Sequence, residues 1–443
     1  MRTTLLADMS KTVAARTFRR GFLKSVGAAA AGVAVGLAVG RYAWIPSSLA
    51  PEAVTQTATH TETIAETTTT TATTTVHDET PRTFCVGGTA YDWLWLKLLE
   101  GYWEKLDPLQ VLKQNGMDWN RVGVLIKHDP VGDPVTWCSV EYAEEVMKSS
   151  VRNGMRLDLF FYLTSSPEGA WWGHQPCPPE WEKFSVTEKA EALRQHTYDT
   201  TKYYRERGFN VEIYEIGNEI DVGILGEIPP ENVDWSDASY MRRNIWNKEA
   251  EMLKGAIRGV RQADPNARTV LHLGGSGRPY FVQAFCRSMM GHEVPFDLVG
   301  LSYYPSTKEG DPGDRPTLDN LRDAVEVIAS FGKKTLIAEY RYPSSPSPEF
   351  SFYDQPVEGY PLTPEGQAKH VADFLRWGYD NQNVAGITYF YPDNFVSEAK
   401  LKMITPGEPH PGMHGSLFFD DTTVKPALYE FKKFRDYLSG CCS

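Results

Sequence analysis

From residue 83 onward, short apolar runs alternate with longer stretches in which apolar residues recur every three or four positions. The short runs have the length of β-strands, and the longer periodic stretches are typical of amphipathic helices. We expect strands over residues 83–90, 119–126, 156–163, 211–217, 268–274, 297–303, 334–339 and 386–391. We expect helices near residues 104–115, 139–153, 187–207, 239–263, 278–290, 317–331, 364–381 and 425–438.

This alternation predicts a parallel sheet whose two faces are both buried. Three of the expected helices are followed by turns that suit a helix C-cap, at Asn115-Gly116, Asn153-Gly154 and Arg207-Gly208. No Gly-x-Gly-x-x-Gly motif follows the first strand, which disfavours an open dinucleotide-binding sheet. The predicted fold class is therefore α/β, a single (β/α)8 TIM barrel that forms the catalytic domain over residues 82–443.

The segment that precedes the barrel, residues 1–50, has the pattern of an export signal. Residues 17–24, TFRRGFLK, resemble the twin-arginine signal, and an apolar run from Val26 to Val39 follows. That run suits the core of a signal peptide and is shorter than the ~20 residues of a membrane span. Pro51 is a poor residue to follow a cleavage site. The segment is therefore expected to be either a cleaved signal peptide or, if it is retained, a membrane anchor. Both place the protein outside the cell or on its surface, exported by the twin-arginine route.

Residues 51–81 form a Thr-rich segment, in which 13 of the 21 residues from Thr55 to Thr75 are Thr. It has almost no large apolar side chain to bury, so it is predicted to be a disordered linker. Thr-rich tracts are often glycosylated stalks, but composition alone does not distinguish a glycosylated stalk from an unmodified linker.

Composition restricts the class of partner. The chain of 443 residues has a net charge of −12, which argues against a nucleic-acid partner because phosphate binding needs a basic face. Aromatic residues make up 12% of the chain, as suits a protein that stacks neutral sugars, although many of the rings must fill the core. The candidate sugar platforms are Trp93, Trp95, Trp171, Trp172 and Tyr391. Of these, Trp95 is the one most expected to belong to the core instead.

The candidate catalytic residues follow from the barrel, because active residues gather where barrel strands end. Asn218 and Glu219 follow the fourth expected strand, and Glu339 ends the seventh. Glutamates at these two strand ends face each other across the mouth of the barrel. A separation of about 5–5.5 Å would let one carboxylate attack a sugar carbon while the other protonates the leaving oxygen. We therefore predict a retaining glycosidase with Glu219 as acid/base and Glu339 as nucleophile, and a structural role for Glu215.

Further polar residues lie on the same ring of strand ends. A buried Arg121 needs a carboxylate partner, and Glu339 is the natural one. His272 is expected either to bond substrate or a catalytic carboxylate, or to be a satisfied core histidine. The hydroxyl of Tyr303 is expected to hold the nucleophile, with Tyr304 as a packing residue.

Four segments, spread over most of residues 85–435, resemble glycoside hydrolase family 53, the endo-β-1,4-galactanases. Residues 217–225, GNEIDVGIL, resemble the family signature GNEI-x-x-G-x-L. Residues 112–121, 300–305 and 337–343 resemble its second-strand, sixth-strand and nucleophile segments. The resemblance implies a retaining (β/α)8 enzyme that cleaves β-1,4-galactan within the chain. It also implies that Asn218 binds the sugar 2-hydroxyl and that Arg121 and Tyr303 support the two glutamates.

Several positions depart from the family pattern. Gly123 stands for an Arg, Phe161 and Thr164 for a His and an Asp, and Gly226 for a Trp. The eighth strand, which exits on Tyr-Trp in the family, reads Tyr389-Phe390-Tyr391-Pro392 here. The alternatives are therefore another retaining β-glycanase, acting on mannan or glucan, a transglycosylase, or a non-catalytic surface protein that binds polysaccharide.

The expected chemistry requires no cofactor and no metal ligand. Some family members carry calcium in the loop after the eighth strand, but residues 393–414 show no ligand spacing that supports it. None of the six cysteines has a zinc-binding spacing. The expected partner is a polysaccharide or an oligosaccharide, with a membrane tether if the N-terminal segment is retained.

Overall fold

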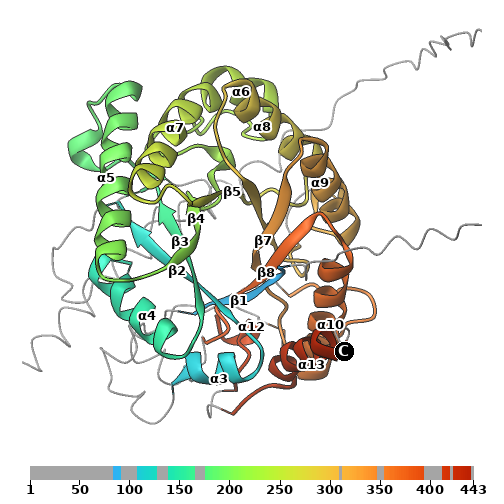
Figure 1. Ribbon diagram of the computed structural model, residues 1–443. Helices are drawn as coiled ribbons and strands as arrows, with labels where there is room; N and C mark the ends of the chain where they lie inside the picture. Colours follow the sequence, from blue (N-terminus) through green and yellow to red (C-terminus); the bar gives the residue numbers. More distant parts are fainter. Residues whose placement is uncertain are drawn as a thin grey trace, which may run out of the picture. The chain divides into compact units, whose positions relative to one another are not determined.

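The computed structural model describes residues 83–90, 107–126, 138–164, 175–308, 312–346, 354–393, 412–419 and 423–440. Eight parallel strands close into a barrel in the order β1 to β8, and helices surround it (Figure 1). The strands are β1 (Cys85–Thr89), β2 (Trp119–Leu125), β3 (Arg156–Tyr162), β4 (Val211–Ile216), β5 (Arg268–Leu273), β6 (Leu298–Tyr303), β7 (Lys334–Tyr340) and β8 (Val384–Phe390). The predicted (β/α)8 barrel is confirmed, and each strand boundary lies within two residues of its expected position.

The helices begin and end where local chemistry favours it. Ser185 caps the start of α5 (Val186–Glu206) with a capping box, in which its hydroxyl accepts from the Glu188 N–H and the Glu188 carboxylate accepts from the Ser185 N–H. Gly116, Gly154 and Gly208 have positive φ at the three predicted C-caps, which are therefore confirmed. The helices are α3 (Pro108–Gln114), α4 (Val140–Arg152), α5 (Val186–Glu206), α6 (Ala238–Asn244), α7 (Trp246–Ala263), α8 (Pro279–Gly291), α9 (Leu318–Ser330), α10 (Pro364–Asp380), α12 (Gly412–Gly415) and α13 (Pro426–Gly440).

One helix prediction was wrong, because residues 239–263 form two helices rather than one. The helical hydrogen-bond pattern is interrupted at Ile245, between α6 and α7. Trp246 then begins α7, and its indole Nε1 donates to the carbonyl oxygen of Asp221 over 2.9 Å. The break thus places a fully buried ring directly beneath the segment that leaves β4.

Apolar side chains form two separate clusters, as expected for a sheet buried on both faces. The larger cluster fills the space between the strands and the helices. The smaller one lies inside the barrel and draws on Cys85, Trp119, Ile213, Val270, Leu298, Leu336 and Ala385. Because strand side chains alternate between faces, Arg121, Glu215 and His272, each two residues beyond a member of this interior layer, also point into the barrel. The apolar layer therefore supports a polar layer above it.

Strand β7 contains an irregularity that changes the direction of Glu339. Ile337 pairs with Leu301, but the next pair joins Ser302 to Glu339, so Ala338 is an extra residue. Ile337 belongs to the cluster that faces the helices. Strict alternation would send Glu339 outward as well, and the extra residue turns it into the barrel instead.

The predicted export signal, residues 1–50, and the whole of the predicted Thr-rich linker, residues 51–81, lie outside the described residues. Among the described helices, none is long and apolar enough to cross a membrane. The thiols of Cys85, Cys177 and Cys286 form no disulfide.

Candidate active site

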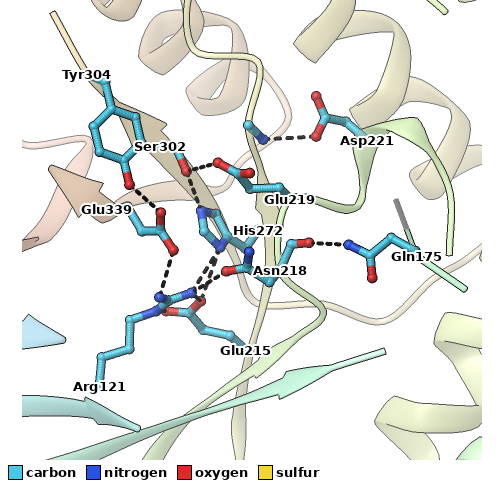
Figure 2. Close-up of polar contacts among 11 residues, drawn as sticks. Arg121, Gln175, Glu215, Asn218, Glu219, Asp221, His272, Ser302, Tyr304 and Glu339 are labelled. Carbon is cyan, nitrogen blue, oxygen red and sulfur yellow. Dashed lines mark hydrogen bonds and ion pairs between the residues drawn. The ribbon is translucent and has the colours of Figure 1, made fainter. Parts of the chain in front are cut away.

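The guanidinium of Arg121 is the centre of the polar layer inside the barrel (Figure 2). It binds Glu215 in a bidentate pair, with Nε 2.9 Å from Oε1 and Nη2 2.7 Å from Oε2. Its Nη1 donates to Oε1 of Glu339 over 2.9 Å, so the expected pairing of these two residues is present. All three side chains are buried, and the Phe160 ring lies 3.8 Å from the guanidinium carbon. Arg121 therefore joins strands β2, β4 and β7 through charge-assisted hydrogen bonds.

The hydroxyl that holds Glu339 belongs to Tyr304, not to Tyr303. Tyr304 donates to the second oxygen of Glu339, Oε2, over 2.5 Å. Tyr303 points away from the barrel interior, where its ring stacks on Phe374 at 4.9 Å and on Tyr340 at 6.2 Å. The prediction for Tyr303 was wrong because neighbouring residues at a strand end face opposite sides, and Tyr303 occupies the side that faces the helices.

Glu219 is held by a separate chain of hydrogen bonds. Nη2 of Arg121 lies 3.0 Å from Nδ1 of His272, and because arginine can only donate, this nitrogen must accept. His272 therefore carries its hydrogen on Nε2, which donates to Ser302 Oγ over 2.9 Å. The serine hydroxyl then donates to Oε1 of Glu219 over 2.6 Å. Since Oε1 accepts this bond, a proton on Glu219 is carried by Oε2.

His272 does not contact a catalytic candidate directly. Its side chain is completely buried, and burial together with the Arg121 charge lowers its pKa well below the ordinary value. Only a neutral imidazole can accept from Arg121 at Nδ1 while it donates to Ser302 at Nε2. Of the two roles expected for His272, the satisfied core histidine is the closer one, with Ser302 as its link to Glu219.

The two candidate carboxyls differ in charge environment. Loss of hydration and the nearby Glu339 carboxylate raise the pKa of Glu219 to about 8, and the Ser302 hydroxyl only partly opposes this. Burial also raises the pKa of Glu339, but the Arg121 cation and the Tyr304 hydroxyl stabilise its ionised form. The first proton of the pair therefore leaves Glu339, and Glu219 stays protonated at neutral pH.

Asn218 is fixed on the same turn as Glu219. Its Oδ1 accepts from Nη2 of Arg121 over 3.0 Å, and its backbone carbonyl accepts from Nε2 of Gln175 over 2.8 Å. Because the amide oxygen faces Arg121, the amide nitrogen is the end that can donate to a ligand.

Among the aromatic candidates, Tyr391 lies beside the site and Trp171 and Trp172 lie outside the described residues, as do Trp93 and Trp95. The half-buried Tyr391 ring packs on Phe390 with centroids 4.0 Å apart, and Phe390 meets Tyr304 edge-on at 6.0 Å. The ends of β6 and β8 thus form one aromatic wall of the mouth.

The described part of the chain contains no group of three or more His, Cys, Asp or Glu side chains that could hold a metal ion. Most of the loop considered for calcium, residues 393–414, lies outside the described residues.

Three contributors to the site were missed from the sequence. Glu215 was identified as structural but not as the bidentate partner of Arg121, and Ser302 and Tyr304 were not assigned to the glutamates. Strand alternation was a usable signal, because a polar residue on the inward face of an apolar strand needs a partner there. With Asn218, these residues place a carboxyl with a raised pKa, Glu219, near a carboxyl whose charge is stabilised, Glu339, a pair suited to proton donation and nucleophilic attack.

A matched pair of substitutions tests the central ion pair. Glu215→Gln removes one of the two charges that neutralise a buried guanidinium, so we expect the free energy of unfolding to fall by about 3 kcal/mol. Glu212 lies on the same strand as Glu215 and forms a partly exposed ion pair with Arg156 on β3, so Glu212→Gln should cost less than about 1 kcal/mol. Denaturant unfolding of both variants measures the difference, and equal losses would contradict a central role for Arg121–Glu215.

Comparisons with known proteins identify relatives that match more than half of the chain. An arabinogalactan endo-β-1,4-galactanase of Cellvibrio japonicus is 26% identical over 356 residues, covering 75% of this chain and 85% of the relative. The corresponding enzyme of Humicola insolens is 23% identical over 301 residues, covering 64% and 81%.

Among solved structures, the Ignisphaera aggregans GH53 catalytic domain superposes with a TM-score of 0.66 at 26% identity, covering 80% of this chain and 97% of that one. Xylanase 10B from Thermotoga maritima, at 18% identity and a TM-score of 0.51, covering 81% and 97%, shares the fold. The family model described as glycosyl hydrolase family 53 matches residues 99–431. The chain therefore belongs to glycosyl hydrolase family 53 and is a glycoside hydrolase.

Proposed function

We propose that this glycoside hydrolase is an endo-β-1,4-galactanase that cleaves galactan with retention of the anomeric configuration. The observation that carries the mechanism is the difference between its two carboxyls. Arg121 and Tyr304 stabilise the charge on Glu339, whereas Glu219 contacts a serine hydroxyl and has a pKa raised to about 8. The substrate follows from the relatives, since those of Cellvibrio japonicus and Humicola insolens are named arabinogalactan endo-β-1,4-galactanases.

In the first step, a Glu339 oxygen attacks the anomeric carbon as the glycosidic carbon–oxygen bond breaks. The proton on Oε2 of Glu219 passes to the leaving oxygen, so the departing sugar leaves as a neutral alcohol. The nucleophile becomes an ester, and Glu219 becomes a carboxylate. The Asn218 amide nitrogen is placed to donate to the sugar 2-hydroxyl.

In the second step, Glu219 takes a proton from water, whose oxygen attacks the same carbon and releases Glu339 as a carboxylate. The first step prepares this change of role. The Glu339 charge is one cause of the raised pKa of Glu219, and esterification removes that charge. The pKa of Glu219 therefore falls once the intermediate has formed, which favours its action as a base.

The location of the enzyme is a further part of the proposal. Residues 1–50 are proposed to direct export by the twin-arginine route, and residues 51–81 to link that segment to the barrel. Both proposals rest on sequence pattern, from the paired arginines at positions 19 and 20 and the Thr content of the linker. A polysaccharide substrate outside the cell is consistent with this location.

A panel of β-linked polysaccharides tests the substrate. We expect hydrolysis of β-1,4-galactan to short oligosaccharides of mixed length, and much slower hydrolysis of mannan and glucan. Product lengths measured by chromatography distinguish internal from terminal cleavage. Preferred hydrolysis of mannan or glucan would replace the galactan assignment, and binding without hydrolysis of any substrate would point to a polysaccharide-binding protein.

Azide rescue tests the two catalytic roles. In Glu219→Ala, with an aryl β-galactobioside whose leaving group needs no acid, azide should intercept the glycosyl-enzyme and give the β-glycosyl azide. In Glu339→Ala, azide should replace the missing nucleophile and give the α-azide. Without azide, each variant should lose at least about 100-fold in kcat on galactan. NMR of the product anomers measures the outcome, and the opposite pair of anomers would exchange the two roles.

A neighbouring pair of tyrosines tests the support of the nucleophile. Tyr304→Phe removes the hydroxyl that binds Glu339, which should lower kcat by about tenfold, the equivalent of one hydrogen bond of about 1.4 kcal/mol. Tyr303→Phe removes a hydroxyl on the helix-facing side and should leave kcat within about twofold. Steady-state kinetics on galactan measure both, and equal effects of the two substitutions would argue against the Tyr304 contact.

A further inference from the structure

The turn that carries Glu219 has a backbone conformation that a glutamate does not favour by itself. Glu219 has φ 49° and ψ 53°, the left-handed conformation that costs a side-chain-bearing residue free energy. The turn lies between Gly217 and Gly223, with φ values of 95° and 107°. A left-handed glutamate persists only where surrounding contacts hold it, so residues that fix this turn also fix the carboxyl that it presents.

Asp221, two residues after Glu219, provides two such contacts. Its Oδ1 accepts from the backbone N–H of Gly274, at the end of β5, over 2.9 Å. Its carbonyl oxygen accepts from the indole of Trp246, at the start of α7, over 2.9 Å. Asp221 and Trp246 are 1% and 0% exposed, so water does not compete for these bonds. The turn is thereby tied to a neighbouring strand and to the helix behind it.

We propose that Asp221 is a positioning residue, which locks the Glu219 turn onto β5 and α7 and places a buried negative charge behind the Glu219 carboxyl. This inference rests on the proposed role of Glu219 as acid/base. Figure 2 shows Asp221 on the side of Glu219 away from Arg121. The two anchoring bonds orient the acid, and the Asp221 charge adds to burial and to the Glu339 charge in raising the pKa of Glu219.

The groups that face Glu219 act in opposite directions. Carboxylates of Glu339 on β7 and Asp221 on its own turn raise its pKa, whereas the Ser302 hydroxyl on β6 and the Arg121 cation on β2 lower it. His272, on β5 behind Ser302, is neutral. Of the two raising charges, Glu339 disappears during the reaction but Asp221 remains. The Asp221 charge therefore favours the protonated acid in the free enzyme and strengthens the base in the intermediate.

Glu249 on α7 provides a matched control. It lies one helical turn after Trp246, is fully buried, and neither of its carboxyl oxygens has a hydrogen-bond partner among the described residues. Burial, followed by the Asp221 charge, raises its pKa well above the ordinary value, so it is neutral at neutral pH. Glu249→Gln therefore changes no charge, whereas Asp221→Asn removes one.

The test titrates Glu219 in the full-length protein by ¹³C NMR of glutamate carboxyl carbons, assigned from the resonance lost in Glu219→Gln. The wild-type midpoint should lie near 8, and Asp221→Asn should lower it by about one unit because a like charge is removed. Glu249→Gln should leave it unchanged. On galactan, the alkaline limb of kcat/KM against pH should move down by the same amount in Asp221→Asn only.

An unmoved Glu219 midpoint in Asp221→Asn, or an equal shift in Glu249→Gln, would overturn the inference. A uniform loss of kcat with an unmoved pH limb would leave Asp221 as a structural anchor alone and would overturn its electrostatic role. If Asp221→Asn does not fold, Asp221→Ser removes the same charge with a smaller side chain, and the same downward shift is expected. A wild-type protein that does not hydrolyse galactan would reject the proposed substrate, while the NMR midpoints still decide the role of Asp221.

Discussion

Burial of one arginine is the constraint on which the site depends. Arg121 is 1% exposed, and a guanidinium without water needs anions close by. It obtains them from two other strands, through Glu215 and Glu339, and adds a bond to Asn218. The cation therefore sets the position of the nucleophile candidate and of the turn before Glu219. The apolar layer beneath it excludes water from the same region.

The two glutamates differ in the groups that donate hydrogen bonds to their carboxyls. Glu339 receives hydrogen bonds from a cation and a phenol, both of which stabilise negative charge. Glu219 receives one bond from Ser302, at the end of a chain that begins at the same arginine. One buried cation thus supports an ionised carboxyl directly and orients a protonated one indirectly. This division matches what double displacement requires of an acid and a nucleophile.

The sequence was sufficient for the barrel because its signals are local and repeated. Short apolar runs predicted all eight strands, and periodic stretches with glycine C-caps predicted the helices between them. The interruption at Ile245 was not visible in the periodicity. The position of a glutamate at the end of β4 and of β7 was equally readable. Family resemblance then added Asn218 and the expected substrate class.

Tertiary structure decided which side chains meet. The extra residue in β7 turns Glu339 inward, and no local pattern around Ala338 announces it. Because residues alternate in direction at the end of β6, Tyr304 contacts Glu339 and Tyr303 does not. Glu219 and Glu339 were recognisable from the sequence because position along a strand is a local property. Their hydrogen-bond partners were not, because those depend on register between strands far apart in the chain, which only the closed barrel brings together.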